Sequence, residues 1–160
     1  MNRKSIAVFG FLTVALLAAP ALATLGEGVT GVVVGRGVVE EQVKVREPGG
    51  TEFVAQQITI QPGGHTGWHT HPGAALAIVT SGALAVTSFR EGRQGDADSA
   101  RSGPRCVTRT VSAGQSFVDP GHGNVHIARN LGTVPAELRV TYTGVPPAGA
   151  FRIDAPDPGC

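Results

Sequence analysis

The feature that most constrains the fold is the near absence of helix signals after the first two dozen residues. Valine, threonine and isoleucine come in short runs, which glycine, proline, asparagine or aspartate interrupt at intervals of about eight to twelve residues. This rhythm is typical of antiparallel sandwiches and barrels. We therefore expect an all-β fold with strands at 29–34, 38–45, 52–60, 67–71, 75–80, 83–89, 106–111, 116–118, 125–129 and 137–143.

Two turns and one loop separate these runs clearly. Gly82 lies between two apolar runs and can take the positive φ that a tight hairpin needs. Asn130 and Gly132 end a later strand in a similar way. Between about 90 and 105 the chain is glycine-rich and charged, which favours a mobile surface loop. A solvated loop is the simpler interpretation, and an anion site is the alternative, for its arginines Arg90, Arg93, Arg101 and Arg105.

The first residues are typical of an export signal. Two basic residues precede an almost unbroken apolar run at 5–19, which is short for a membrane span. Small residues then fit the pocket of a signal peptidase. We predict a signal peptide at 1–23, cleavage after Ala23, and a secreted or extracytoplasmic single domain at 24–160. A retained anchor and a buried helix are the alternative interpretations of the same run.

The net charge argues against two classes of partner. Loss of Arg3 and Lys4 with the signal removes two positive charges from a formal net charge of +1 and leaves −1. A charge this small gives no field that would recruit nucleic acid or an anionic membrane. We expect neither partner, and the remaining length suits one core.

Two cysteines, Cys106 and Cys160, remain in the predicted mature chain. An even count in an exported protein is more often a disulfide than a pair of free thiols. The bridge would pin a proline-rich tail at 146–159, which we expect to wrap the outside of the barrel. A thiolate ligand or nucleophile at Cys106 is the alternative, although no CxxC spacing or local base accompanies it.

The chemistry concentrates in segment 63–73, which contains His69 and His71. Side chains at positions i and i+2 of a strand point to the same face, so these two imidazoles would project together. Two imidazoles on one face make half of a metal site. For this His-x-His sequence alone, a hydrogen-bonded pair without a metal is the alternative.

Two segments of the chain resemble the conserved motifs of the cupin superfamily. The first cupin motif, at 63–82, is matched by Gly63, His69, His71 and Gly82. The second motif, at 114–130, is matched with one extra residue in its turn by Gly114, Pro120, Gly123, His126 and Asn130. The resemblance covers about 56–142 and implies a cupin-type jelly-roll β-barrel with a metal inside its mouth.

The chain departs from the cupin pattern at one chemically important position. Ala75 stands where the glutamate ligand of the family falls, and the longer permitted spacing reaches Leu76. The resemblance then implies an open three-histidine metal site of His69, His71 and His126. Neutral imidazoles suit one divalent transition metal, Fe, Zn, Cu or Ni, better than magnesium or calcium. A closed structural site would need a fourth protein ligand.

Other residues near the motifs receive no catalytic role. We expect His65 and His122 to face solvent, with completion of the metal site as the alternative for either one. Trp68 and Phe117 are expected to fill the core, although one of them could instead border the pocket. Arg129 and Asn130 are expected to close the strand that carries His126.

The resemblance implies two functions that use the same three histidines. Some cupins with three-histidine iron sites are dioxygenases of thiols or diketones, so a missing glutamate is compatible with catalysis. We expect an exported cupin that binds a divalent metal and, if it is an enzyme, acts as a metal-dependent oxygenase on a small organic molecule. The alternatives are a non-catalytic module that binds a metal or small ligand, and a barrel that has lost its ligands. Cupins often dimerise through barrel edges, so a homodimer is a family expectation.

Overall fold

Nine β-strands form the regular structure in the computed structural model, which describes residues 28–90 and 105–160. The strands are β1 (Glu52–Ile60), β2 (His69–Thr70), β3 (Ala75–Ser81), β4 (Ala83–Arg90), β5 (Arg105–Ser112), β6 (Ser116–Asp119), β7 (His126–Arg129), β8 (Ala136–Val145) and β9 (Ile153–Asp154). The predicted signal peptide at 1–23 lies outside the described residues, as do Arg93 and Arg101 of the predicted loop.

The strands follow from a period-two alternation of buried and more exposed residues. In β3, Ala75, Ala77 and Val79 are buried, whereas the residues between them are only partly buried. β8 likewise buries every second residue from Ala136 to Tyr142. Each sheet therefore has one apolar face, and these faces meet in a single core.

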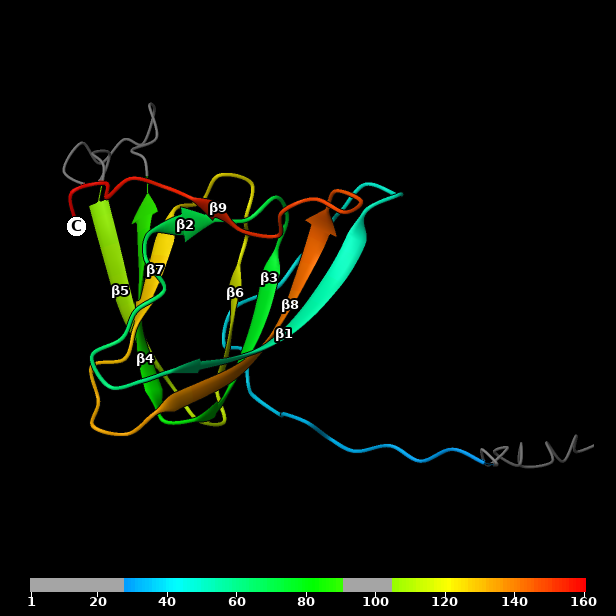
Figure 1. The fold of residues 1–160 in the computed structure, drawn as a ribbon, viewed down its shortest axis with the longest axis horizontal. Helices are drawn as coiled ribbons and strands as arrows, with labels where there is room; N and C mark the ends of the chain where they lie inside the picture. Colours follow the sequence, from blue (N-terminus) through cyan, green and yellow to red (C-terminus); the bar gives the residue numbers. More distant parts are fainter. Residues whose placement is uncertain (1–27, 91–104) are drawn as a thin grey trace, which may run out of the picture. The chain divides into compact units, whose positions relative to one another are not determined.

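Two antiparallel sheets make up the barrel, and all nine strands lie in one compact unit, Val33–Cys160. One sheet has the order β1-β8-β3-β6 and the other the order β5-β4-β7-β2-β9. The sheets face each other, with β5, β4 and β7 on one side and β6, β3 and β8 on the other (Figure 1). This confirms the predicted all-β jelly-roll barrel. None of the described residues forms a helix long and apolar enough to cross a bilayer.

Both predicted turns are present. Gly82 joins β3 to β4 with a φ of 66°, and a Cβ at this position would lie 2.8 Å from the Pro135 carbonyl oxygen. Few L residues adopt such a φ, and none would have room here. Asn130 follows β7 and is only 1% exposed, and its side-chain amide donates hydrogen bonds to the carbonyl oxygens of Ile60 and Val134. It therefore fastens the turn to β1.

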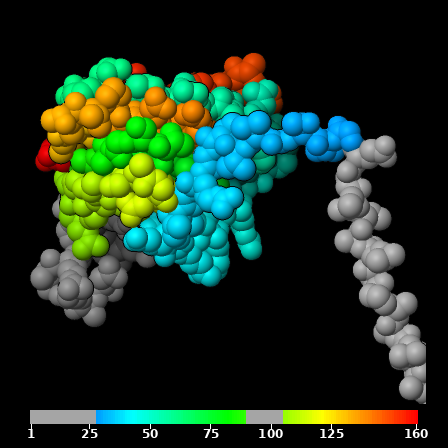
Figure 2. Space-filling model, turned by 90° about the horizontal axis from the view of Figure 1, so that it is seen from below, coloured from blue at the N-terminus to red at the C-terminus, as the bar shows by residue number. Residues whose placement is uncertain are grey.

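Two predicted strands, 29–34 and 38–45, do not form. The only β-bridge in these ranges joins Val38 to Gln115, and large side chains such as Val33 remain exposed. Figure 2 shows the cyan part of this segment beside the yellow-green residues of β5 and β6. An apolar alternating sequence becomes a strand only where a partner offers free backbone groups, and this segment finds one at a single residue.

The strands on either side of the predicted loop each extend one residue further than expected, to Arg90 in β4 and from Arg105 in β5, and residues 91–104 between them lie outside the described residues. These two residues are register partners in the β4–β5 ladder, which extends over eight residue pairs. Their charge had favoured a place in the loop. β5 is an edge strand, and an edge strand with one solvated face accepts a charged residue such as Arg105 readily.

The proline-rich tail contributes a strand that the sequence analysis did not predict. β9 pairs with β2, where Asp154 lies opposite His69 and Ile153 lies opposite Thr70. Phe151, just before β9, packs against the hydrophobic core. The predicted disulfide between Cys106 and Cys160 is present, with 5.9 Å between the Cα atoms. The tail therefore contributes a strand to the second sheet as well as covering its outside.

Removal of the disulfide should destabilise the barrel. The double variant Cys106→Ser with Cys160→Ser should lose up to about 4 kcal/mol of unfolding free energy, because the bridge closes a long loop with a sequence separation of 54. Urea unfolding of the two proteins measures the difference. A thiol titration of the unfolded, unreduced wild type is the control, and two reactive thiols there would contradict the bridge.

Candidate metal centre

The barrel brings the three predicted ligands to one place. His69 lies in β2 directly opposite His126 at the start of β7. His71 lies two residues after His69 and therefore faces the same side. All three are buried, with exposed fractions of 5% for His69, 3% for His71 and 5% for His126. Strand parity and strand pairing thus assemble the cluster.

The three rings are close enough to share one ion. One nitrogen from each ring lies within 4.8 Å of the others. The ring centroids of His69 and His126 are 4.3 Å apart, and those of His71 and His126 are 5.2 Å apart. Metal–nitrogen bonds are about 2 Å long, so a single ion would require only a small closure of the rings. Among the described residues, these histidines form the one group of this kind.

Backbone carbonyl groups determine which nitrogen of each ring is free. Nδ1 of His69 lies 2.8 Å from the Gly67 oxygen, and Nδ1 of His71 lies 2.7 Å from the Phe151 oxygen. Nδ1 of His126 lies 3.4 Å from the backbone oxygen of Asn124. A carbonyl oxygen only accepts hydrogen bonds, so Nδ1 of His69 and Nδ1 of His71 must carry the proton and donate it, and the longer contact favours the same form of His126. Each Nε2 then keeps the lone pair that a metal requires.

Burial also keeps these imidazoles neutral. Burial, followed by the neighbouring His126 ring, lowers the pKa of His69 to about 3. Burial, followed by His71, lowers the pKa of His126 to about 4. Burial lowers the pKa of His71 as well. A neutral imidazole is the form that binds a metal, so all three side chains are ready to bind near neutral pH.

The missing glutamate leaves a small cavity beside the histidines. Ala75 lines this cavity of about 40 Å³ together with the three histidine rings and Tyr142. The Tyr142 ring lies 4.8 Å from the ring of His71 and 4.8 Å from that of Phe151. Ala75 therefore faces the site as the cupin pattern implies, but it offers no ligand atom.

Asp119 is a site residue to which the sequence analysis gave no role. It is 5% exposed, and its Oδ1 lies 3.5 Å from Nδ1 of His126. The side-chain amide of Asn124 and the backbone N–H of Gly121 donate hydrogen bonds to its carboxylate. Burial raises the pKa of Asp119, and these hydrogen bonds oppose the increase. Parity with Phe117, two residues earlier on β6, would have predicted its inward direction.

The two remaining motif histidines lie outside the cluster. His65 accepts a hydrogen bond at Nδ1 from the backbone N–H of Gly67, at 3.0 Å. His122 has a side chain that is 58% exposed, and its Nε2 lies 3.7 Å from a carboxylate oxygen of Glu47. Trp68, as expected, is buried, and the guanidinium of Arg129 lies 5.5 Å from its ring centroid. None of these residues joins the group of possible ligands.

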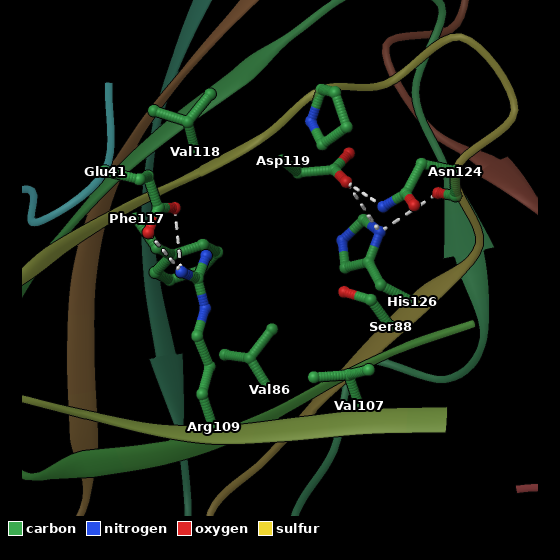
Figure 3. A pocket seen from close by; sticks show the side chains of 11 residues that line it. Glu41, Val86, Ser88, Val107, Arg109, Phe117, Val118, Asp119, Asn124 and His126 are labelled. Atoms are coloured by element: carbon green, nitrogen blue, oxygen red, sulfur yellow. Dashed lines mark hydrogen bonds and ion pairs between the residues drawn. The ribbon is translucent and has the colours of Figure 1, made fainter. Parts of the chain in front are cut away.

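A larger pocket of about 400 Å³ adjoins the histidine cluster (Figure 3). Phe117, Asp119 and His126 line both this pocket and the small cavity. Across the pocket, Arg109 forms an ion pair with Glu41 at 2.8 Å, and its guanidinium lies 5.4 Å from the Phe117 ring centroid. One ring nitrogen of His126 faces Asp119 and the other points away from it (Figure 3). The pocket therefore reaches the histidine site from the side of Asp119.

Acidification should weaken the folded protein when no metal is bound. The unfolded chain contains ordinary histidines with pKa near 6.5, whereas folding lowers the pKa of His69 to about 3 and that of His126 to about 4. Below about pH 6.5 the unfolded chain therefore binds more protons, and the unfolding free energy should fall as the pH is lowered to about 5. Urea unfolding of chelator-treated protein across this range measures the slope.

The matched variants for this prediction are His69→Gln with His126→Gln, and separately His122→Asn. The double variant should make the slope shallower, because two of the three buried histidines that resist protonation are gone. His122→Asn should keep it, because that side chain is largely exposed. An unchanged slope in the double variant would contradict the assignment.

The family model described as a cupin domain matches residues 56–142, which is more than half of the chain. None of the curated proteins matches. Similar solved structures include an oxalate oxidase, with 26% identity over 64% of this chain and 46% of that chain and a TM-score of 0.49.

Two further solved structures are similar over comparable lengths. The oxalate decarboxylase of Lactobacillus farciminis in its formate complex is 24% identical over 65% of this chain and 27% of that chain, with a TM-score of 0.49. A Cupin 2 conserved barrel domain protein of Salinispora arenicola is 18% identical over 57% and 63%, with a TM-score of 0.42. The match spans less than half of the length of the oxalate oxidase. From the family model, which covers both histidine motifs, the chain belongs to the cupin family.

Proposed function

We propose that this cupin is exported, holds one divalent transition metal through His69, His71 and His126, and oxidises a small organic molecule with oxygen. The proposal of a metal rests on one observation, which is that the three imidazole rings share the same burial, charge and hydrogen bonding. Each is buried and neutral, with its Nδ1 engaged by a backbone carbonyl group and its Nε2 free.

The donor set fits iron, zinc, copper or nickel. Three imidazoles without a carboxylate form a ligand set of intermediate softness. Such a set binds these ions in preference to magnesium or calcium. When bound, such an ion would supply Lewis acidity, and a redox-active one would also supply oxygen chemistry. With Ala75 in place of the family's glutamate, the group of possible ligands found among the described residues contains no carboxylate. Coordination positions therefore stay available to substrate.

The adjoining pocket supports an organic substrate. Its volume of about 400 Å³ lies in the range typical of small-molecule sites. Phe117 offers an apolar surface, and Arg109, held by Glu41, offers a positive group on the same wall. A substrate bound there would approach the side of the site that His126 and Asp119 form. The chain's own residues thus bind and orient the molecule.

Export is supported by two independent features. The charged start and apolar run at 1–23 have the composition of a signal peptide. The disulfide between Cys106 and Cys160 suits an oxidising compartment outside the cytoplasm.

Export predicts a processed protein. Expression of the full chain in a host with a secretory pathway should release a protein whose N-terminal sequence begins at Thr24. Edman sequencing or mass spectrometry of the extracytoplasmic fraction measures this. A chain that keeps residues 1–23 and stays in the cytoplasm would contradict export.

The metal and oxygen chemistry are tested on the purified mature protein. Elemental analysis should find one transition-metal ion per chain. His126→Ala should weaken metal binding by at least about 100-fold, because loss of a direct ligand lowers the affinity more than loss of a residue that only hydrogen-bonds to a ligand. Oxygen uptake would be recorded with panels of thiols, diketones and phenols, and uptake by the wild type should disappear in His126→Ala.

The exposed His122 provides the matched control. His122→Asn should keep both metal and activity, since this residue lies outside the ligand group and asparagine tolerates its φ of 51°. Tight metal binding without turnover would favour the non-catalytic binding module. Absence of metal in the wild type would overturn both the metal site and the oxygen chemistry.

A further inference from the structure

Asp119 lies on the strand next to the one that carries Ala75, the position of the missing glutamate. In the pairing of β3 with β6, Asp119 is the register partner of Ala75. Both residues line the same cavity as the three histidines. Directly opposed residues on one face of an antiparallel pair are nearest neighbours. The carboxylate that Ala75 lacks is therefore present one strand away.

The three histidines are not held equally well. The carbonyl contacts to Nδ1 are 2.8 Å for His69 and 2.7 Å for His71, but 3.4 Å for His126. A contact of 3.4 Å is long for a hydrogen bond. Oδ1 of Asp119 lies 3.5 Å from the same nitrogen of His126. The ring that lacks a short carbonyl contact is thus the one with a carboxylate beside it.

Asp119 is itself fixed in an accepting orientation. The Asn124 amide donates to Oδ1 and the Gly121 N–H donates to Oδ2. Together with Nδ1–H of His126, three N–H groups face two oxygens, and the side chain is only 4% exposed. The nitrogen atoms of Asn124 and Gly121 donate, and Nδ1 of His126 also faces the Asn124 carbonyl oxygen, which favours its protonated form, so the carboxyl group accepts from all three.

We propose that Asp119 is the positioning residue of the metal centre. It accepts a hydrogen bond from Nδ1–H of His126 and so directs the Nε2 lone pair of this ring into the cavity. A carboxylate thereby acts on the site through His126, where the family pattern places one on the metal. Outer partners of this kind orient a histidine ligand and raise its basicity. The inference rests on the proposed metal-binding function.

The first measurement compares metal affinity. Asp119→Asn keeps the size of the side chain but leaves one oxygen for three donors, so one N–H must face another N–H. We expect Zn²⁺ and Co²⁺ to bind about 10–100-fold more weakly than to wild type in competition with a chromogenic chelator. Glu137→Gln is the matched control. Glu137 lies between buried Ala136 and Leu138 in β8 and points away from the core, so its loss should leave affinity unchanged.

The second measurement needs no metal. In the chelator-treated wild type, ¹⁵N NMR of the imidazole rings should show the proton of His126 on Nδ1. In Asp119→Asn this proton should move toward Nε2, because the remaining carbonyl contact of His126 is long, whereas the short carbonyl contacts of His69 and His71 should keep their protons on Nδ1. A merely structural role for Asp119 would disturb all three rings together.

The outcomes separate this inference from the proposed function. Weaker metal binding together with a tautomer change confined to His126 supports the inference. Wild-type affinity in Asp119→Asn overturns it and leaves the proposed function standing, as does a change spread over all three rings. A wild type that binds neither ion overturns both. Should Asp119→Asn not fold, Asp119→Glu replaces it. The longer side chain should also weaken binding and alter the His126 signal, and unchanged values would overturn the inference.

Discussion

The histidine site depends on where three ring protons are held. A buried imidazole with its proton on either nitrogen would be equally neutral, but only one of the two forms presents its lone pair to the centre of the cluster. Carbonyl oxygens of Gly67, Phe151 and Asn124 favour that form, because each accepts from an Nδ1. The backbone conformation of three separate segments thus determines the side-chain chemistry. Burial then keeps the rings uncharged.

The histidine cluster could be predicted from the sequence because it depends on local rules. His69 and His71 share a face by strand parity, and the spacing of the second cupin motif identifies His126. The absence of a ligand at Ala75 is also a matter of spacing, and the cavity beside it agrees with that prediction. Parity from Phe117 would have extended the same argument to Asp119. That residue was missed because it belongs to no family motif position, not because the signal was absent.

The rest of the architecture depends on partners that no local pattern reveals. The segment around Val38 has the apolar alternation of a strand, yet only one of its residues finds a β-partner. β9 is only two residues long and follows a proline-rich stretch, so nothing in its own sequence indicates pairing with β2. Its neighbour Phe151 supplies the carbonyl oxygen that holds His71. Contacts between residues so far apart in the sequence form only when the barrel closes.

The pairing of β9 with β2 also bears on how the site forms in time. His71 and Phe151 are separated by 80 residues along the chain, and closing a loop of this length precedes any contact between them. The cluster cannot serve as an early nucleus around which the barrel condenses. In kinetic terms, an ordered binding site is a product of long-range closure, so a metal would enter a barrel that has already folded.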